Sequence, residues 1–160
     1  MQTEESELIH YERTLDIDAA PDTVWAVIGR FMHIDEFAPL VKSVEALTDD
    51  EDGVGSKRRC NFEDGTSVVE EVTKWEPNRG YRVRLLEMSA MPLHEVHAEL
   101  SVEPLENERT RVTWGMDYRV KFGPFGWLLG QTVMKLMMGK ILDGNLSGLA
   151  NKARSDRAGT

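Results

Sequence analysis

The sequence contains one cysteine, Cys60, which excludes an internal disulfide. Positive charge is also scarce, because 19 Lys and Arg against 28 Asp and Glu give a net charge of −9. This balance argues against a nucleic-acid partner and against a surface held by anionic lipid. No long apolar run is free of charge, since Lys135, Lys140 and Asp143 interrupt the most apolar stretch, so we expect no integral membrane span. The single cysteine and the polar segment Met1–Glu7 indicate a reducing cytoplasm and no signal peptide.

The length of 160 residues predicts one domain, spanning about residues 7–154 between flexible tails at 1–6 and 155–160. Hydrophobic periodicity and turn residues divide that domain into a strand, two short helices, six strands and a long helix. The predicted strands are Leu8–Asp18, Val41–Leu47, Ser56–Glu63, Thr66–Trp75, Tyr81–Met88, Leu93–Leu105 and Arg109–Val120. The predicted helices begin at Pro21, at His33 and at Gly123, and the last runs to about Ala153.

The C-terminal helix is the element around which we expect the rest to be arranged. At about 100° per residue its apolar side chains form one arc roughly 180° wide. The arc consists of Trp127, Met134, Met137, Met138, Ile141, Leu142, Leu146 and Leu149, and a second group off the arc consists of Leu129, Val133 and Leu136. Two interpretations follow. The helix is a core element buried under loops as well as sheet, or its methionines line a cavity, because flexible thioethers adapt to ligands of irregular shape.

Consecutive strands joined by short turns predict an antiparallel meander of about seven strands. One long helix can cover one face of such a sheet, which makes the fold class α+β. Alternation in the last two strands predicts an inner face made of His94, Val96, Ala98, Leu100, Val102, Val112, Trp114, Met116, Tyr118 and Val120. A strongly curved sheet cannot fill all the space beside a straight helix with side chains, so we expect a cavity between them.

Five segments carry a resemblance to a known family. Ile17–Trp25 matches a strand-to-helix opening of the form APxxVW, Glu70–Pro77 resembles ERVxxWDP, and Asn145–Leu149 resembles a closing NLxxL. Phe37–Pro39 and Val112–Trp114 match the short second helix and the strand before the last helix. The chain therefore resembles the START-like helix-grip superfamily (SRPBCC), in its polyketide cyclase/dehydrase and lipid-transport branch. The resemblance implies the helix-grip fold and an apolar ligand, but it does not choose between binding, carriage and catalysis.

The sequence departs from that family at one mid-sheet position, where Glu71 replaces an arginine. Because neighbouring strand residues alternate, either Glu70 or Glu71 must face inward. A buried carboxylate needs a partner or takes up a proton, and the candidate partners are Arg58, Arg82 and Arg84. The alternative is that the inward carboxylate lies at the wet edge of the sheet.

Catalytic candidates are few. His94 suits general acid–base work because its unperturbed pKa lies near neutrality, and Tyr118 could donate a hydrogen bond to a ligand carbonyl. The alternative for both is a structural role in the core. His94 and His97 are three residues apart, so on a regular strand they point to opposite faces and do not form a metal clamp. The acidic turn Asp49–Gly53 lacks the spacing of a calcium loop. We expect neither a metal nor another cofactor.

Three hypotheses follow. The preferred one is a protein that binds, transports or sequesters an apolar small molecule, such as a lipid, an isoprenoid or a polyketide-like aromatic. The second is a cyclase or dehydratase that uses His94 as its acid–base. The third is an interaction protein with a filled core, whose apolar helix half serves a partner or a homodimer.

For the first hypothesis we expect the entrance between Phe31–Leu40, Ser89–Pro92 and Gly123–Gly130. The expected ligand-binding residues are Phe37, Arg58, Phe62, Glu71, Tyr81, His94, Val96, Trp114, Met116, Tyr118, Leu128, Met134, Met137, Met138 and Ile141.

Overall fold

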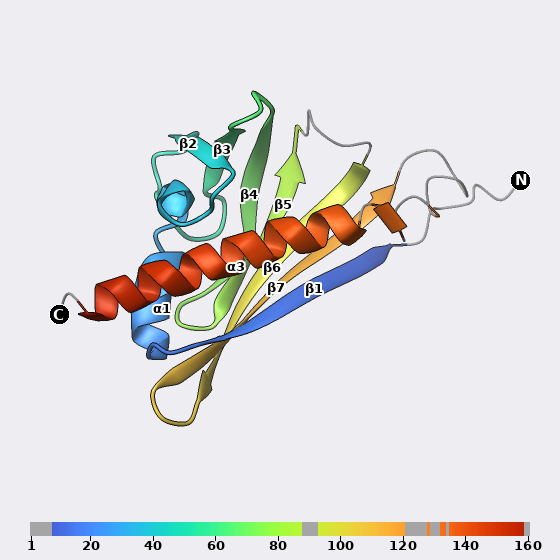
Figure 1. Ribbon diagram of the computed structural model, residues 1–160. Helices are drawn as coiled ribbons and strands as arrows, with labels where there is room; N and C mark the ends of the chain where they lie inside the picture. The colour runs from blue at the N-terminus through green and yellow to red at the C-terminus, as the bar shows by residue number, and fades with distance from the viewer. Residues whose placement is uncertain (1–7, 88–92, 121–127, 129–131, 134, 159–160) are drawn as a thin grey trace, which may run out of the picture.

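The chain runs through a strand, two short helices, six strands and a long helix in the computed structural model, which describes residues 8–87, 93–120, 128, 132, 133 and 135–158. Within these residues seven strands form one sheet, and the long helix crosses it (Figure 1). This arrangement confirms the predicted α+β helix-grip fold. The elements are β1 (Ile9–Ile17), α1 (Pro21–Ile28), η1 (Phe31–Glu36), β2 (Val41–Ala46), β3 (Lys57–Phe62), β4 (Ser67–Glu76), β5 (Gly80–Leu86), β6 (Leu93–Leu105), β7 (Arg109–Val120) and α3 (Lys135–Ala158).

The sheet has the order β1-β7-β6-β5-β4-β3-β2, and every neighbouring pair is antiparallel. Strands β2 to β7 form the predicted meander, and β1 pairs with β7, with Ile9 opposite Tyr118 and Ile17 opposite Thr110. The consecutive strands β1 and β2 therefore lie at opposite edges of one sheet. The segment that contains α1 and η1 connects the two edges.

Local sequence explains the start of α1 and the end of η1, although η1 begins at Phe31 and not at the predicted His33. Pro21 occupies the first turn of α1, where its missing N–H would have no partner in any case. Gly29, the C-cap residue of α1, donates its backbone N–H to the carbonyl of Trp25 at 2.7 Å. The next helical segment, η1, is a 3₁₀ helix that ends at Glu36, shortly before Pro39.

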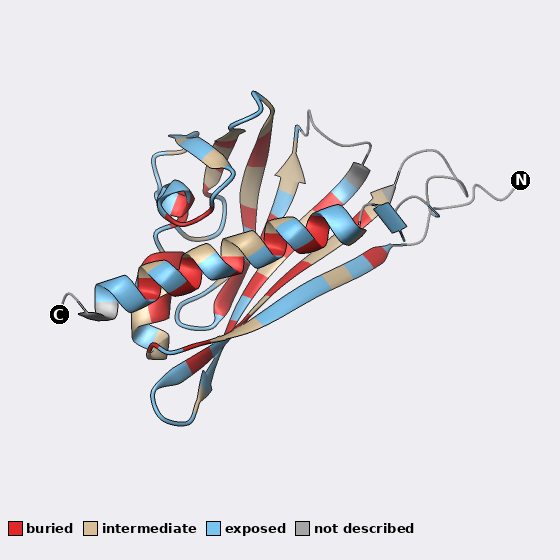
Figure 2. Ribbon diagram, viewed as in Figure 1, coloured by how far each residue is buried: buried red, intermediate tan, exposed pale blue. Residues whose placement is uncertain are grey.

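The long helix is described from Lys135 to Ala158, so it extends beyond the predicted end near Ala153. Residues 123–127, 129–131 and 134 of the predicted helix lie outside the described residues. Buried and exposed positions alternate along α3, as expected for a helix with one face on the sheet (Figure 2). Val133 and Leu136 are 55% and 70% exposed, so the expectation that this second apolar group is buried under loops is wrong for these two residues.

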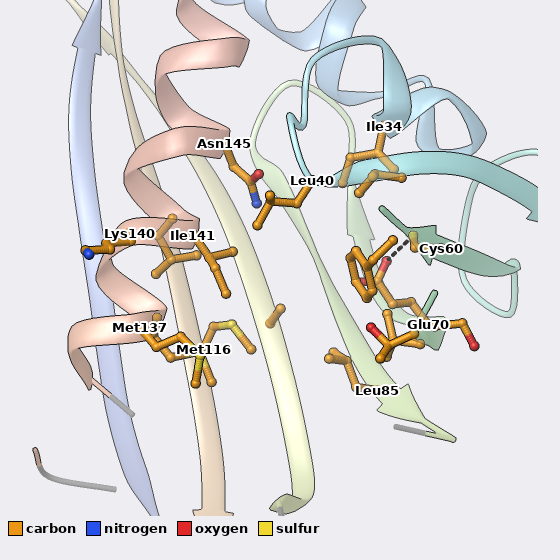
Figure 3. A pocket seen from close by; sticks show the side chains of 18 of the residues that line it. Ile34, Leu40, Cys60, Glu70, Leu85, Met116, Met137, Lys140, Ile141 and Asn145 are labelled. Atoms are coloured by element: carbon orange, nitrogen blue, oxygen red, sulfur yellow. Dashed lines mark hydrogen bonds between the residues drawn. The ribbon is translucent and has the colours of Figure 1, made fainter. Parts of the chain in front are cut away.

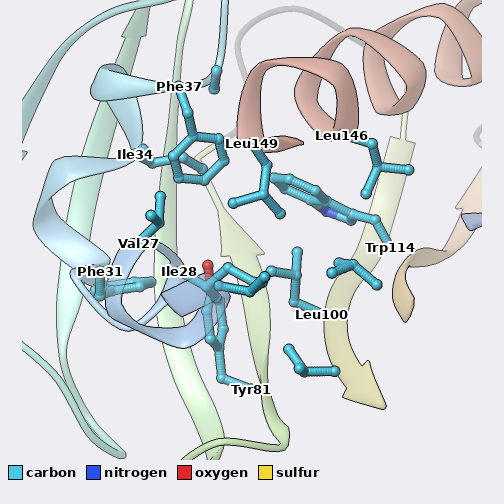
Figure 4. Packing of buried hydrophobic residues seen from close by; sticks show 14 of the residues in the cluster. Val27, Ile28, Phe31, Ile34, Phe37, Tyr81, Leu100, Trp114, Leu146 and Leu149 are labelled. Carbon is cyan, nitrogen blue, oxygen red and sulfur yellow. The ribbon is translucent and has the colours of Figure 1, made fainter. Parts of the chain in front are cut away.

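Buried side chains form two clusters. The larger one joins α1, η1, the sheet and the C-terminal half of α3, where Phe37, Trp114, Leu146 and Leu149 lie close together (Figure 4). Its rings pack edge to face, for example Phe37 and Trp114 with centroids 6.4 Å apart. The smaller cluster, at the other end of the sheet, consists of Ile9, Val96, Tyr118 and Met138.

Strand β6 contains a β-bulge. Its register against β7 shifts between His94 and His97, and Glu95, between them, has a φ of 54°. His94 pairs with Arg119, and His97 pairs with Asp117. Regular alternation through His94 therefore does not hold in this strand, although the predicted inward positions Val96, Ala98, Leu100 and Val102 are buried.

Candidate functional site

A cavity of about 480 Å³ lies between the first part of α3 and strands β3 to β7 (Figure 3). This volume is within the range of about 300–1,000 Å³ typical of small-molecule pockets. The apolar lining residues are Ile34, Leu40, Val41, Phe62, Val68, Leu85, Ala98, Trp114, Met116, Met137, Met138, Ile141 and Leu142. The polar lining residues are Cys60, Glu63, Asp64, Thr66, Ser67, Glu70, Lys140 and Asn145. The third hypothesis required a filled interior, and this cavity contradicts that requirement.

Geometry explains why the space is open. The two buried clusters fill the two ends of the interface between α3 and the sheet, and the cavity lies between them. Its sheet wall carries the small side chain of Ala98, and its helix wall carries Met137 and Met138. Large apolar side chains surround Ala98, whose small side chain leaves space unfilled. The flexible thioethers can then adapt their shape to what enters.

The rim of the cavity contains exposed residues from three segments. These are Leu40 before β2, Glu63 and Asp64 in the β3–β4 turn, and Met137 and Lys140 on α3. The predicted entrance included the segment that ends at Leu40, and this residue does reach the rim. Ser89–Pro92 and all of Gly123–Gly130 except Leu128 fall outside the described residues, where 88–92, 121–127 and 129–131 are not described.

An ion pair lies at the sheet wall. The Arg58 Nε donates to Glu70 Oε2 at 2.6 Å, and Nη2 lies 2.5 Å from the same oxygen. The Nη1 of Arg58 donates to the carbonyl oxygen of Phe31, and the guanidinium carbon lies 3.9 Å from the centre of the Phe31 ring. Burial alone would lower the pKa of Arg58, but the adjacent Glu70 carboxylate raises it, so the guanidinium stays charged. Removing either partner would leave a buried charge without compensation.

Two further ionisable groups surround this pair. The Cys60 Sγ lies 3.8 Å from Glu70 Oε2, and burial followed by the negative charge of Glu70 raises the pKa of Cys60 to about 12. The thiol therefore remains protonated at neutral pH and is not a nucleophile. Burial also raises the pKa of Tyr81, which stacks on Trp75 at 5.3 Å.

The structure brings six of the predicted ligand-binding residues together on the cavity wall: Phe62, Trp114, Met116, Met137, Met138 and Ile141. Five others are buried but do not line the cavity: Phe37, Arg58, Tyr81, Val96 and Tyr118. Leu128 is exposed. The side chains of His94 and Met134 lie outside the described residues.

The choice between the two glutamates is also resolved by their partners. Glu70 lines the cavity and pairs with Arg58. Glu71 pairs instead with Lys57 at 3.2 Å and with Arg84 at 2.9 Å, on the other face of the sheet. The placement of Glu71 among the inward residues is therefore corrected.

Sequence reasoning could have found Glu70, because it alternates with two apolar residues, Val68 and Val72, both of which are buried. That period-2 pattern puts Glu70 in phase with them. Ala98 was expected on the inner face of the sheet from alternation, and Leu40 in the entrance segment, whereas Asn145 had no signal of this kind.

Two other kinds of feature are absent from the described part of the chain. Across those ranges, no three His, Cys, Asp or Glu side chains gather in a way that could hold a metal ion. In the same residues, no helix combines the length and the apolar character needed to cross a membrane.

Solved structures with the same architecture include an aromatase/cyclase called Zhui, from a Streptomyces species, at 17% identity and a TM-score of 0.76, with 92% of this chain and 94% of that chain covered. A START superfamily protein from Mycobacterium smegmatis matches at 17% identity and 0.74, covering 91% and 97%. A norcoclaurine synthase point mutant from Thalictrum flavum matches at 15% identity and 0.74, covering 96% and 98%. At these identities the likeness shows the fold alone.

No curated protein matches this chain. The sequence of residues 9–154, however, matches the family described as polyketide cyclase / dehydrase and lipid transport. This match covers both buried clusters, the cavity and the Arg58–Glu70 pair. The chain belongs to the polyketide cyclase/dehydrase and lipid-transport family.

Proposed function

We propose that this protein binds an apolar small molecule, such as a lipid, an isoprenoid or a polyketide-like aromatic, in the cavity between α3 and the sheet, and that it transports or sequesters this molecule. The observation that carries the proposal is the cavity of about 480 Å³ with thirteen apolar lining residues. Membership of a family whose description includes lipid transport supports it.

The affinity would come mainly from apolar surface removed from water, at about 25 cal/mol per Å² before entropy losses. Trp114, Phe62 and the methionines Met116, Met137 and Met138 offer both flat and adaptable contacts. A rigid aromatic or a bent chain would therefore find complementary surface. Partial exposure of Met137 at the rim gives the ligand a path of entry.

We favour binding over catalysis because of the ionisable groups that the cavity presents. The described lining residues include no histidine, and Cys60 has its pKa raised to about 12 by burial and by Glu70. Cyclase or dehydratase chemistry benefits from a group that titrates near neutrality. The candidates for that role, His94 and Tyr118, are respectively outside the described side chains and buried in the smaller cluster.

Native mass spectrometry of protein purified from cells tests the proposal, together with titration by fatty acids and by flat aromatics. We expect a co-purifying ligand or a rise in melting temperature, because a ligand at 100 times its Kd stabilises the folded state by about 2.7 kcal/mol. Absence of a bound species combined with no thermal shift from any compound would contradict the proposal.

A cavity-filling variant sharpens this test. Ala98→Phe places a ring in the cavity and should weaken binding about tenfold or more, since the ligand loses the space it needs. Leu136→Ser is the matched control, because Leu136 is 70% exposed on the same helix as the lining methionines but does not line the cavity. Equal loss in both variants would show that the binding surface lies elsewhere.

A further inference from the structure

The carboxylate of Glu70 uses only one of its two oxygens within the protein. The contacts of Arg58 Nε, Arg58 Nη2 and Cys60 Sγ all go to Oε2. Within the described residues, Oε1 has no hydrogen-bond partner. This oxygen is not sealed in the protein interior, because the Glu70 side chain is 13% exposed and lines the cavity.

The carboxylate group that contains Glu70 Oε1 is held in a fixed position by Arg58. Arg58 is almost completely buried and holds the carboxylate from one side by two contacts to the same oxygen. The guanidinium is itself fixed by the Phe31 carbonyl and ring. A carboxylate held in this way presents its remaining lone pairs in a set direction. Glu70 lines a cavity whose walls are mostly apolar, where an acceptor without a donor is costly.

We propose that Glu70 Oε1 accepts a hydrogen bond from a hydroxyl group of the ligand, so that the cavity selects neutral apolar alcohols or phenols. This inference rests on the proposed binding function and names the ligand class for the same cavity. The Arg58–Glu70 pair thus anchors the polar end of the ligand. The apolar remainder extends toward Met116, Met137 and Ile141, on the opposite side of the cavity in Figure 3.

The charges around the cavity disfavour a fatty acid or another anion. The charged lining residues are Glu70, whose charge is matched by Arg58, two further carboxylates, Glu63 and Asp64, and one amine, Lys140. The positive charge of Arg58 is already matched by Glu70, and Arg58 does not reach the cavity wall. An anionic head group would therefore lose its water next to like charges. A neutral hydroxyl group has no such cost.

Three probes that share one bicyclic ring test the inference: 2-naphthol, 2-methoxynaphthalene and 2-naphthoate. They differ in offering a hydrogen-bond donor, no donor, or a negative charge. Fluorescence titration at neutral pH should show 2-naphthol binding about tenfold or more tightly than 2-methoxynaphthalene, because a hydrogen bond to a charged group contributes that much. We expect 2-naphthoate to bind most weakly.

Variants connect this preference to one side chain. Glu70→Gln should reduce the preference for 2-naphthol over 2-methoxynaphthalene to about one or below, because an amide can turn its N–H group toward the cavity. Glu71→Gln is the matched control, because Glu71 is the next residue in β4 but pairs with Lys57 and Arg84 on the other face. It should keep the tenfold preference.

A double variant covers the case in which Glu70→Gln does not fold. Arg58→Met combined with Glu70→Met replaces the ion pair by apolar side chains of similar length, a change that buried pairs often tolerate. It should bind 2-methoxynaphthalene as the unaltered protein does and show no preference for 2-naphthol. Retention of the preference in either Glu70 variant would overturn the inference.

The experiment distinguishes a failure of the proposed binding function from a failure of the proposed hydroxyl selection by Glu70. If none of the three probes binds, the proposed function fails as well. If all three bind and 2-methoxynaphthalene equals 2-naphthol, or if 2-naphthoate binds most tightly, the cavity binds ligands but Glu70 does not select a hydroxyl group.

Discussion

The two halves of α3 have different surroundings. From Leu142 to Ala153 the helix packs against α1, η1 and the sheet, and its inward residues are almost fully buried. From Lys135 to Ile141 it faces the cavity, and Met138 is its only inward residue in that stretch that belongs to a buried cluster of the described chain. One helix thus has a packed half that holds the fold together and an open half that borders a binding space.

Small residues explain how the packed half comes so close to its neighbours. A Cβ atom added at Gly148 would lie 1.9 Å from the carbonyl oxygen of Phe37, at the end of η1. The segment after η1 therefore lies directly on the helix backbone. In the open half, a Cβ atom added at Gly139 would lie 2.7 Å from the Oη of Tyr11, which is the end of a side chain and not backbone, and Met137 and Lys140 form part of the rim of the cavity.

The largest expected effect is the loss of a leucine from the packed half. Leu149→Ala removes a side chain that is fully buried and should lower the free energy of unfolding by about 2–5 kcal/mol. Leu136→Ala, the same substitution in the open half, should change it by about 0.5 kcal/mol or less, because Leu136 is mostly exposed. Urea unfolding of both variants measures the difference. Similar losses would mean that the two halves are equally packed.

The second largest effect is expected at the contact between Gly148 and the carbonyl of Phe37. Gly148→Ala should destabilise the fold by about 2 kcal/mol, since the new Cβ must push the Phe37 carbonyl away. The control is Gly144→Ala, where the added Cβ would lie 3.5 Å from Pro39, an ordinary contact. It should be neutral or stabilising by up to about 1 kcal/mol, because alanine favours helix. Thermal unfolding of both proteins decides the prediction, which fails if Gly148→Ala is the more stable variant.

A larger side chain should destabilise the packed half more than the cavity. Ala150→Phe, in the packed half, should cost about 1–3 kcal/mol through overpacking. Ala98→Phe, on the sheet opposite the open half, should cost less than about 1 kcal/mol because the ring enters existing space. Chemical denaturation compares the two. A larger loss at Ala98 would indicate that the cavity cannot accept a side chain of this size.

The smallest expected effect on stability comes from His10, on the outer face of the sheet and next to Ile9 of the smaller buried cluster. A hydrogen bond at 2.6 Å to Asp117 raises the pKa of His10 above 6.5, with Glu12 adding to the effect. The protonated ring therefore stabilises the folded state fully below pH 6.5, and this contribution is lost as the pH rises through the raised value. Because His10 is largely exposed, the contribution should be less than about 1 kcal/mol.

The measurement is the free energy of unfolding as a function of pH from below 6.5 upward. His10→Gln should remove the decrease across that range, while His33→Gln, at an exposed position on η1, should keep it. Asp117 also pairs with Arg82, and this pair persists in both variants. An unchanged pH dependence in His10→Gln would contradict the assignment.

The sequence was informative where local pattern decides structure. Each strand of the meander and the Pro21 start of α1 follow from periodicity and from the restricted backbone of proline. The inward positions of β7, from Val112 to Tyr118, follow from alternation in the same way. Six of the cavity-lining residues were also expected, because they belong to these patterns.

The remaining features depend on contacts between distant parts of the chain. The bulge at Glu95 breaks the alternation of β6, and nothing in the local sequence marks it. The inward position of Glu70 is stabilised by Arg58, which is next to it only after β3 and β4 pair. Val133 and Leu136 are apolar and yet exposed, so composition alone misplaces them.

The pairing of β1 with β7 has a consequence for how the protein is made. Ile9 cannot reach its partner Tyr118 until the ribosome has synthesised almost the whole domain, and α3 emerges later still. The first strand must wait, unpaired, while the meander grows. The cavity is therefore incomplete until α3 has been translated, because this last element of the domain forms one of its walls.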